Sequence, residues 1–282
     1  MAEPGTLLSD LYGRYGAEIA EVLDKVRAFI ASSGDSEISK AAEEFPLDEF
    51  CVLKFILSAL RKKAAYKEVA YSNLMGTLRF RKEHRPLLEN ARASKELLTT
   101  WPSVFGGYLG SELVIVSYMG KLKVNEVMAK FETVDALVGH GLGGGEQIRL
   151  ILDKRSRESG RLCKLLSVVD LNGITAAQSM NMKMMKALQI LTKANETHIP
   201  QMSSKIVVVR PPGLISTVLA VSKRFLSKQS AEKLVVCKGS KESLKGKGVE
   251  ACPFLSRFEH ADQSIPEDIG GSLRSPSVTV EI

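Results

Sequence analysis

Residues 139–144, Gly-His-Gly-Leu-Gly-Gly, have the G-x-G-x-x-G spacing with which dinucleotide-binding proteins hold a pyrophosphate. In those proteins the glycines follow a β-strand and open a helix. Here they follow residues 126–137, which have the apolar spacing of an amphipathic helix. We therefore expect the glycines to form a flexible break between two helices. A nucleotide-dependent enzyme is the least supported of three hypotheses for function.

The other residue types that perform chemistry form no recognisable site. His84, His140, His198 and His260 are far apart and lack the spacing of metal ligands. The sequence contains neither a G-x-S-x-G nucleophile elbow nor a P-loop. We therefore predict no catalytic residue, no metal site and no cofactor, and a protein that is not an enzyme.

The cysteines and the N-terminus indicate a cytoplasmic protein. Cys51, Cys163, Cys237 and Cys252 form no C-x-x-C pair, so we expect reduced core residues and no disulfide framework. The first residues do not resemble a signal peptide, and no apolar run approaches the roughly 18 residues of a membrane span. With 44% hydrophobic and 25% charged residues, the 282-residue chain has the composition of a soluble globular protein.

Charge is distributed in blocks along the chain. Residues 1–50 hold four Lys or Arg against eleven Asp or Glu, and residues 51–95 hold eleven against three. Residues 205–248 hold ten against two, beside strongly apolar stretches. Positive charge next to apolar surface favours an anionic partner, which could be a membrane, an acidic protein or nucleic acid. No aromatic or zinc-finger motif supports nucleic acid, so we predict none.

The elements that must position any site change in character near residue 101. Before it, apolar residues recur at helical spacing over residues 7–30, 46–60 and 67–84. After it, β-rich runs at 113–118, 165–171, 205–210 and 233–237 alternate with helical stretches near 124–137, 145–158, 176–196 and 214–227. The alternation predicts an α/β fold with strands buried on both faces.

Two segments after residue 175 carry apolar residues suited to a cavity. Met180 and Met184 belong to a methionine cluster, which is compatible either with an adaptable pocket wall or with an ordinary core helix. The stretch 214–226 predicts a helix with a broad apolar face, which could cover a cavity and meet a membrane. That face includes Leu214, Ile215, Val218, Leu219 and Phe225.

Over residues 45–275 the chain resembles the CRAL-TRIO lipid-binding family, of the type found in the fungal secretory phosphatidylinositol and phosphatidylcholine transfer protein. Residues 167–174 are similar to the family strand that ends in D-L-x-G, and residues 198–212 to Y-P-E-R, a strand and N-x-P. Residues 214–233 resemble the gate helix and the following turn, and 265–271 the terminal L-P-x-x-F/Y-G-G. Residues 53–62 resemble the L-R-F-L-R-A-R-K of the N-terminal module.

The resemblance implies a mixed sheet that floors a hydrophobic pocket, closed by a helical gate and preceded by an all-helical module. We expect that module at 1–100, the lipid-binding domain at 101–275 and a flexible tail at 276–282. For the gate helix and pocket the resemblance implies the five apolar residues of 214–226 named above, with Met180 and Met184. For the lipid headgroup it implies Lys223, Arg61, Lys62, Gln201 and Ser167. Gln201 stands where the family has an acidic residue, and Arg210 where it has an asparagine.

The first hypothesis is therefore a monomeric, non-enzymatic protein that binds one phospholipid, phosphatidylinositol or a related lipid, as its ligand. It would transfer or present that lipid at cytoplasmic membranes, with peripheral contact to anionic surfaces. The second hypothesis is a lipid-sensing regulatory module that acts through a protein partner, for which the acidic N-terminus is a candidate surface.

Overall fold

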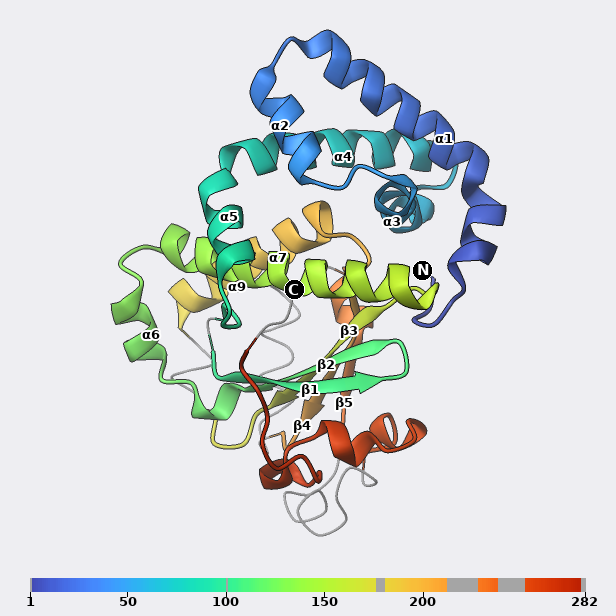
Figure 1. Ribbon diagram of the computed structural model, residues 1–282. Coiled ribbons are helices and arrows are strands. Elements are labelled where there is room, and N and C mark those ends of the chain that lie inside the picture. Colours follow the sequence, from blue (N-terminus) through green and yellow to red (C-terminus); the bar gives the residue numbers. More distant parts are fainter. Residues whose placement is uncertain (1, 100, 176–180, 212–227, 238–251, 280–282) are drawn as a thin grey trace.

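The computed structural model describes residues 2–99, 101–175, 181–211, 228–237 and 252–279. Figure 1 shows an N-terminal group of helices stacked on two long helices, α7 and α9, which cover one face of a sheet. Segments from the C-terminal part of the chain cover the opposite face. The fold is thus α/β with a helical N-terminal region, as the sequence predicts.

The N-terminal region consists of five α-helices and one short 3₁₀ helix. They are α1 (Leu8–Ser33), α2 (Ser36–Glu44), α3 (Glu49–Ala59), η1 (Leu60–Ala65), α4 (Tyr66–Glu83) and α5 (Arg85–Ala93). Gly34 ends α1 in the left-handed conformation (φ 64°), and the Asp35 side chain caps α2 by accepting from the backbone N–H groups of Glu37 and Ile38. The three predicted helices are confirmed, whereas the sequence patterns missed the nine-residue helices α2 and α5.

The acidic and basic blocks of the N-terminal region pair with each other. Their ion pairs are Glu21–Lys67, Asp35–Lys82, Glu37–Arg85, Glu44–Arg85 and Glu44–Arg92. Most of these carboxylates lie on α1 and α2, and most of the cations on α4 and α5. The opposite charges therefore hold neighbouring helices together, which removes part of the acidic surface considered for a protein partner.

Within the described residues the sheet has five strands in the order β1-β2-β3-β4-β5. They are β1 (Ser103–Leu109), β2 (Glu112–Tyr118), β3 (Lys164–Asp170), β4 (Ser203–Val209) and β5 (Leu234–Val236). β1 runs antiparallel to β2, and the remaining pairs are parallel. The four predicted strands are confirmed. β1 was not predicted, because Gly106 and Gly107 interrupt its apolar pattern where the register shifts.

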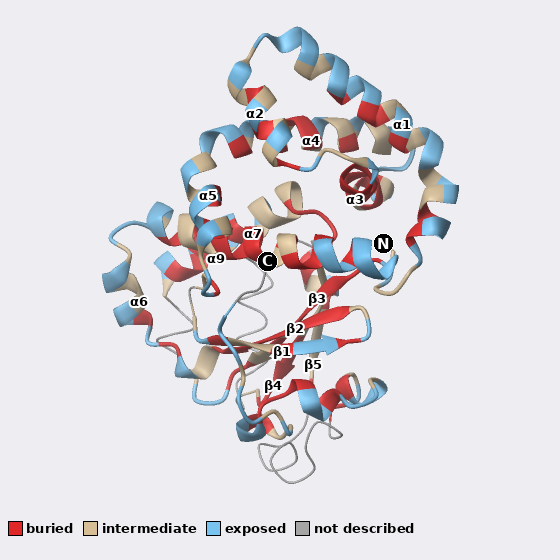
Figure 2. Ribbon diagram, viewed as in Figure 1, coloured by how far each residue is buried: buried red, intermediate tan, exposed pale blue. Residues whose placement is uncertain are grey.

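The two faces of the sheet pack against different partners. Alternate residues such as Val114, Leu166 and Val207 pack against the C-terminal segments. Their neighbours Ile115 and Leu165 face the helices with α7. Figure 2 shows most of the strands buried. The near-continuous apolar runs in the sequence follow from this double coverage.

Helices α6 (Val124–Lys130), α7 (Val134–Ser159) and α9 (Met182–His198) complete the layer above the sheet, with the short η2 (Met119–Lys121) after β2. The expected break at residues 139–145 is wrong, because these glycines lie inside the continuous helix α7. A Cβ built on Gly144 would lie 1.9 Å from the Leu98 carbonyl oxygen, and one on Gly141 would lie 2.7 Å from Leu191 Cδ1. The glycines therefore allow close packing. The break falls between α6 and α7.

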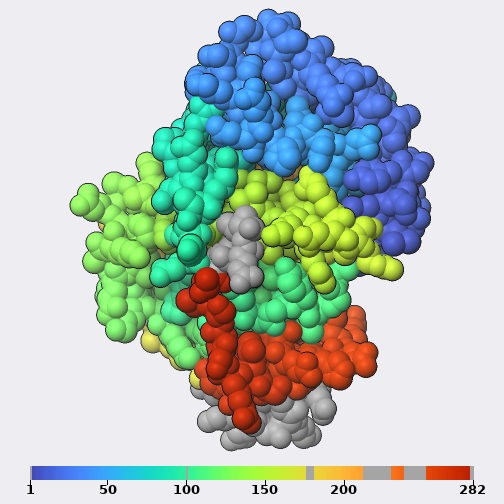
Figure 3. Space-filling model, viewed as in Figure 1, coloured from blue at the N-terminus to red at the C-terminus, as the bar shows by residue number. Residues whose placement is uncertain are grey.

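The C-terminal part contains α11 (Lys228–Glu232) and three short 3₁₀ helices, η4 (Leu255–Arg257), η5 (Ala261–Ser264) and η6 (Glu267–Ile269). Beyond them, the described part of the expected tail, as far as Thr279, crosses the surface toward the helical layer (Figure 3). The Ser277 carbonyl accepts from Phe105 N (2.9 Å), and the Val278 carbonyl from Leu97 N (2.9 Å). The first of these bonds uses the free edge of β1, and the second joins the tail to the segment that precedes β1.

The cysteines divide into two pairs. Cys51 and Cys163 are free and buried, as expected. Cys237 and Cys252 are also buried but form a disulfide, which the sequence analysis did not expect. No spacing motif in the sequence indicates a disulfide between two cysteines 15 residues apart, because the end of β5 meets the C-terminal segment only in the folded chain.

Candidate functional site

The candidate site is a cavity of about 310 Å³ between the sheet and helices α7 and α9. Its floor includes Ile115 of β2, Ser167 of β3 and Ile206 of β4, which are direct neighbours in the sheet register. The volume lies within the roughly 300–1,000 Å³ of small-molecule sites. The parallel register thus places one row of side chains from three strands under a single ligand.

Helices α9 and α7 form the roof. α9 contributes Leu188, Leu191 and Asn195, which share one helix face by their spacing of three and four residues. α7 contributes Gly141 and Ile148, with Gly144 and Gly145. Because glycine has no side chain, the backbone of α7 itself forms part of the cavity wall.

A smaller polar chamber of about 120 Å³ adjoins this cavity. Both volumes are bounded by Thr192, Asn195, Met202, Ser203 and Ile206. The chamber is further lined by polar side chains, namely Ser58, Glu196, Gln201, Ser230 and Lys233. An apolar compartment that adjoins a polar one matches an amphiphile, whose hydrocarbon and polar parts need different surroundings.

Among the described residues, the chamber wall holds one cation, Lys233, and one carboxylate, Glu196. Lys233 is 7% exposed, and burial lowers its pKa; Glu196 opposes this shift, and Arg61 and Lys205 add to it. Burial, followed by the charge of Lys233, lowers the pKa of Lys164 to about 8. Each positive charge disfavours the next, so an anion would be stabilised among them.

Gln201 lies at the wall of the chamber in a left-handed backbone conformation (φ 62°). Its Oε1 accepts a hydrogen bond from Lys164 Nζ (2.7 Å). Its Nε2 is buried and has no hydrogen-bond partner among the described residues. A buried donor without a partner is costly, and a ligand oxygen would relieve that cost.

The predicted headgroup residues occupy different places. Ser167 lies on the cavity floor and Gln201 on the chamber wall. Arg61 is half exposed and pairs with Glu232 (2.7 Å), next to Lys233 in the chain. Lys62 is exposed on η1 and lines neither compartment.

The pocket predictions are only partly covered by the described residues. Met184 is buried but lines neither compartment, because it packs with Leu122 and Leu137 in a cluster of α6, α7 and α9. The other residues predicted for the gate, pocket or headgroup lie outside the described residues: Met180, Leu214, Ile215, Val218, Leu219, Lys223 and Phe225.

The sequence analysis missed Lys233 and Asn195. Lys233 is the last residue of the segment 214–233 that resembles the gate helix and the following turn, and its burial depends on contacts that no local pattern encodes. Asn195 lies on the apolar face of α9, where a helical pattern alone indicates core packing.

The segments that resemble family motifs meet at Arg210. Its guanidinium binds the Asp170 carboxylate through two hydrogen bonds and donates a third to the Asp268 carbonyl (2.8 Å). The Asp268 carboxylate accepts from Tyr118 OH (2.8 Å) and Lys121 Nζ (2.9 Å). This cluster fixes the ends of β2, β3 and β4 to the C-terminal segment, immediately before residues 212–227.

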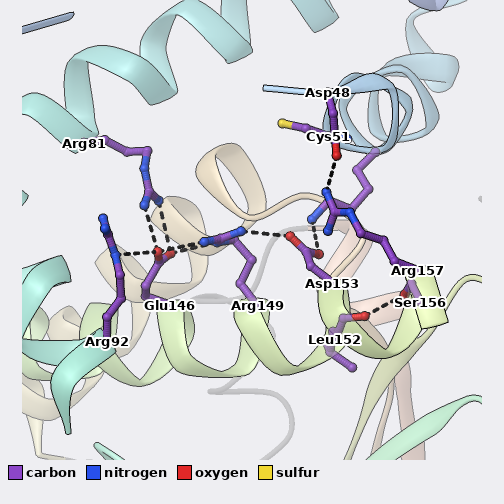
Figure 4. A network of polar contacts seen from close by, with 11 residues as sticks. Asp48, Cys51, Arg81, Arg92, Glu146, Arg149, Leu152, Asp153, Ser156 and Arg157 are labelled. Carbon is purple, nitrogen blue, oxygen red and sulfur yellow. Dashed lines mark hydrogen bonds and ion pairs between the residues drawn. The ribbon is translucent and has the colours of Figure 1, made fainter. Parts of the chain in front are cut away.

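A buried ion network connects the N-terminal helices to α7 (Figure 4). Glu146 binds Arg81 of α4 and Arg149 of its own helix, and Asp153 binds Arg149 and Lys54 of α3. Burial alone would raise the pKa of Glu146, but Arg149 and Arg81 hold it well below its usual range. The roof of the cavity is therefore anchored to the helical region through paired charges.

The described part of the chain holds neither a metal site nor a spanning helix. Among those residues, no group of three or more His, Cys, Asp and Glu side chains could hold a metal ion. None of the helices described is long and apolar enough to cross a membrane.

Comparisons with known proteins bear on the family and the fold. The sequence model of the CRAL/TRIO domain matches residues 112–271, which is more than half of the chain. No curated protein matches the sequence. The fold is similar to the crystal structure of Sfh5, with a TM-score of 0.55 and 17% identity over 82% of this chain and 83% of that one. At that identity the likeness shows the fold alone.

Proposed function

The chain belongs to the CRAL/TRIO family of lipid-binding domains, and from this premise we propose that it binds a single phospholipid and transfers or presents it at cytoplasmic membrane surfaces. The observation that carries the proposal is the apolar cavity over the sheet, which adjoins a polar chamber containing Lys233. The cavity suits hydrocarbon, and the chamber suits a charged headgroup.

A protein that encloses the hydrocarbon chains of a lipid lowers the free-energy cost of moving that lipid through water. Exposing acyl chains to water costs about 0.8 kcal/mol per methylene, or on the order of 20 kcal/mol for a diacyl lipid. Spontaneous movement between membranes is therefore slow. A protein that shields the chains removes most of that cost during transit.

The charge of the chamber favours phosphatidylinositol or another phosphate-bearing lipid. Lys233 offers a cation and Gln201 an N–H donor without a partner among the described residues. Phosphate oxygens accept from both kinds of donor. Lys223 remains a further candidate from the family resemblance, and we expect Lys223→Ala to weaken phosphatidylinositol binding more than phosphatidylcholine binding.

Native mass spectrometry of the purified protein, with lipid analysis of the released ligand, tests this function. We expect one phospholipid per chain and transfer of that lipid between liposomes. A protein that carries no lipid and moves none would refute the proposal. Binding of lipid without transfer would instead favour a lipid-sensing module.

A further inference from the structure

Four side chains form a hydrogen-bonded cluster in the cavity wall, apart from the polar chamber. Trp101 Nε1 donates to Ser117 Oγ (3.2 Å), which lies 2.8 Å from Ser103 Oγ. Thr99 Oγ1 lies 3.4 Å from Ser103 Oγ and donates to the Trp101 carbonyl (2.9 Å). All four residues line the cavity, and none lines the chamber. We call Thr99, Trp101, Ser103 and Ser117 the hydroxyl cluster.

The sheet determines where this cluster lies. Ser103 and Ser117 are direct cross-strand partners of β1 and β2, which brings their hydroxyls together. The polar chamber instead touches β4 and Lys233, the residue before β5. Strands are spaced about 4.8 Å apart, so β2 and β5 are separated by roughly 14 Å. The hydroxyl cluster and the polar chamber therefore lie toward opposite edges of the sheet, with Ile115, Leu165 and Ser167 on the floor between them.

The Trp101 indole requires an acceptor at Ser117, whereas Ser103 Oγ contacts only the hydroxyls of Ser117 and Thr99 among the described residues. Ser103 and Ser117 are 6% and 7% exposed, and the floor positions on β2 and β3 are Ile115, Leu165 and Ser167. At position 103 an apolar residue of similar size would fill the same space and would leave the Trp101 N–H with its acceptor. The buried Ser103 hydroxyl, which Trp101 does not need, therefore points to a polar group of the ligand.

The hydrogen bonds within the hydroxyl cluster show which donors and acceptors remain for a ligand. Trp101 Nε1–H goes to Ser117, and the Thr99 proton goes to a carbonyl. One serine proton occupies the 2.8 Å contact between Ser103 and Ser117. The other faces either the 3.4 Å contact to Thr99 or a ligand. A ligand hydroxyl could accept this proton and donate to a remaining serine lone pair, whereas an ether or ketone could only accept.

We propose that the hydroxyl cluster binds an aliphatic hydroxyl group carried on the hydrocarbon part of the ligand. This inference rests on the proposed lipid-binding function and adds a second polar contact to it. The hydroxyl belongs either to a neutral lipid alcohol, whose only polar group it is, or to a hydroxylated acyl chain whose charged end lies in the chamber. Both sources present the same chemistry to Ser103 and Ser117.

Two matched ligand pairs test the proposal by displacement of a fluorescent fatty acid from the full-length protein. One pair is 1-hexadecanol and its methyl ether, and the other is 16-hydroxyhexadecanoic acid and hexadecanoic acid. We expect the hydroxylated member to bind about tenfold more tightly, as one net hydrogen bond allows. A preference in the first pair alone identifies a neutral alcohol, and one in the second pair identifies a hydroxylated chain. No preference in either pair overturns the proposal.

Variants assign the preference to the cluster. Ser103→Ala leaves the Trp101–Ser117 bond in place and should reduce the affinity ratio toward one, whereas Ser117→Thr keeps the hydroxyl and should preserve it. Ser111→Ala, in the turn of the same hairpin outside the cavity, is the matched control. The ratio is measured within one protein, so a general loss of folding cancels. Phospholipid binding without hydroxyl preference refutes this inference alone, whereas loss of all lipid binding refutes the proposed function.

Discussion

Arg210 binds the Asp170 carboxylate through two parallel hydrogen bonds, from Nε to Oδ1 at 2.9 Å and from Nη2 to Oδ2 at 2.5 Å. Both side chains are buried. The two residues end neighbouring parallel strands, β4 and β3. Arg210 has a left-handed backbone conformation (φ 46°), which surrounding contacts must hold in place. The ion pair therefore fixes the direction in which the chain leaves the sheet before residues 212–227.

Replacement of Arg210 should destabilise the protein, because the Asp170 carboxylate would stay buried without its cation. We expect Arg210→Gln to lower the free energy of unfolding by about 3–5 kcal/mol, because Asp170 is left buried without its cation. Urea denaturation followed by circular dichroism measures the change. Arg274→Gln, which removes the exposed ion pair with Glu267, is the control and should cost less than about 1 kcal/mol. Equal effects would mean that burial of the pair is unimportant.

A methyl group at Gly144 should separate α7 from the segment that precedes β1. We expect Gly144→Ala to destabilise the protein by about 1–3 kcal/mol, because the new Cβ would lie 1.9 Å from a backbone oxygen that cannot rotate away. Thermal unfolding provides the measurement. Gly76→Ala in α4 has open space and should stabilise by roughly 0.5–1 kcal/mol. If Gly144→Ala changed the stability in the same way as Gly76→Ala, the close approach of Gly144 to the Leu98 carbonyl would be contradicted.

Stability should fall when the medium is acidified from pH 6.5 to pH 4. Burial, followed by the charges of His84 and Arg81, lowers the pKa of His198 to about 4. Between these pH values the unfolded chain binds a proton that the folded chain does not, so acid favours unfolding. We expect a loss of about 1–2 kcal/mol, less than full linkage because His198 is only partly shielded from water.

Urea titrations at several pH values test this effect. His198→Gln should flatten the dependence over this range, whereas the control His260→Asn, at an exposed position, should not. A parent-like slope in the His198→Gln protein would assign the acid sensitivity to another group.

Loss of the buried chamber cation should discriminate between ligands by charge. We expect Lys233→Met to weaken phosphatidylinositol binding about tenfold or more, because a hydrogen bond to a charged group contributes roughly 1.5–3 kcal/mol. Diacylglycerol with the same acyl chains lacks the phosphate and should lose little affinity. Displacement titrations compare the two ligands, with Lys183→Met on the exposed face of α9 as control. Equal losses of affinity for both lipids would mean that Lys233 supports the structure and does not bind the phosphate.

Local sequence patterns were sufficient for much of the fold. The four predicted strands and the helices over 7–30, 46–60 and 67–84 were recoverable, because apolar periodicity and capping residues act over a few positions. β1 was not predicted because its glycines interrupt that periodicity. The glycines of α7 were wrongly predicted to break the helix because their packing partners, Leu98 and Leu191, are more than 40 residues away in the sequence.

The site was less predictable than the fold. The family resemblance led to Ser167 and Gln201, which line the cavity and the chamber. Nothing in the spacing of residues indicated that Lys233 is buried beside Gln201, or that the Ser103 and Ser117 hydroxyls lie 2.8 Å apart. Those facts depend on strand register and on which elements cover each strand.

The sequence by itself determined the fold class, the order of the family motifs and the blocks of charge, since each is written in neighbouring residues. The tertiary structure decided how those blocks are used: Glu21, Glu37 and Glu44 of α1 and α2 pair with cations of α4 and α5, and Lys233 is buried in the chamber wall. It also decided that Arg210 meets Asp170 and that α7 is anchored by buried ions. The physical reason is burial, because a charge or hydroxyl gains its effect only when distant segments exclude water around it.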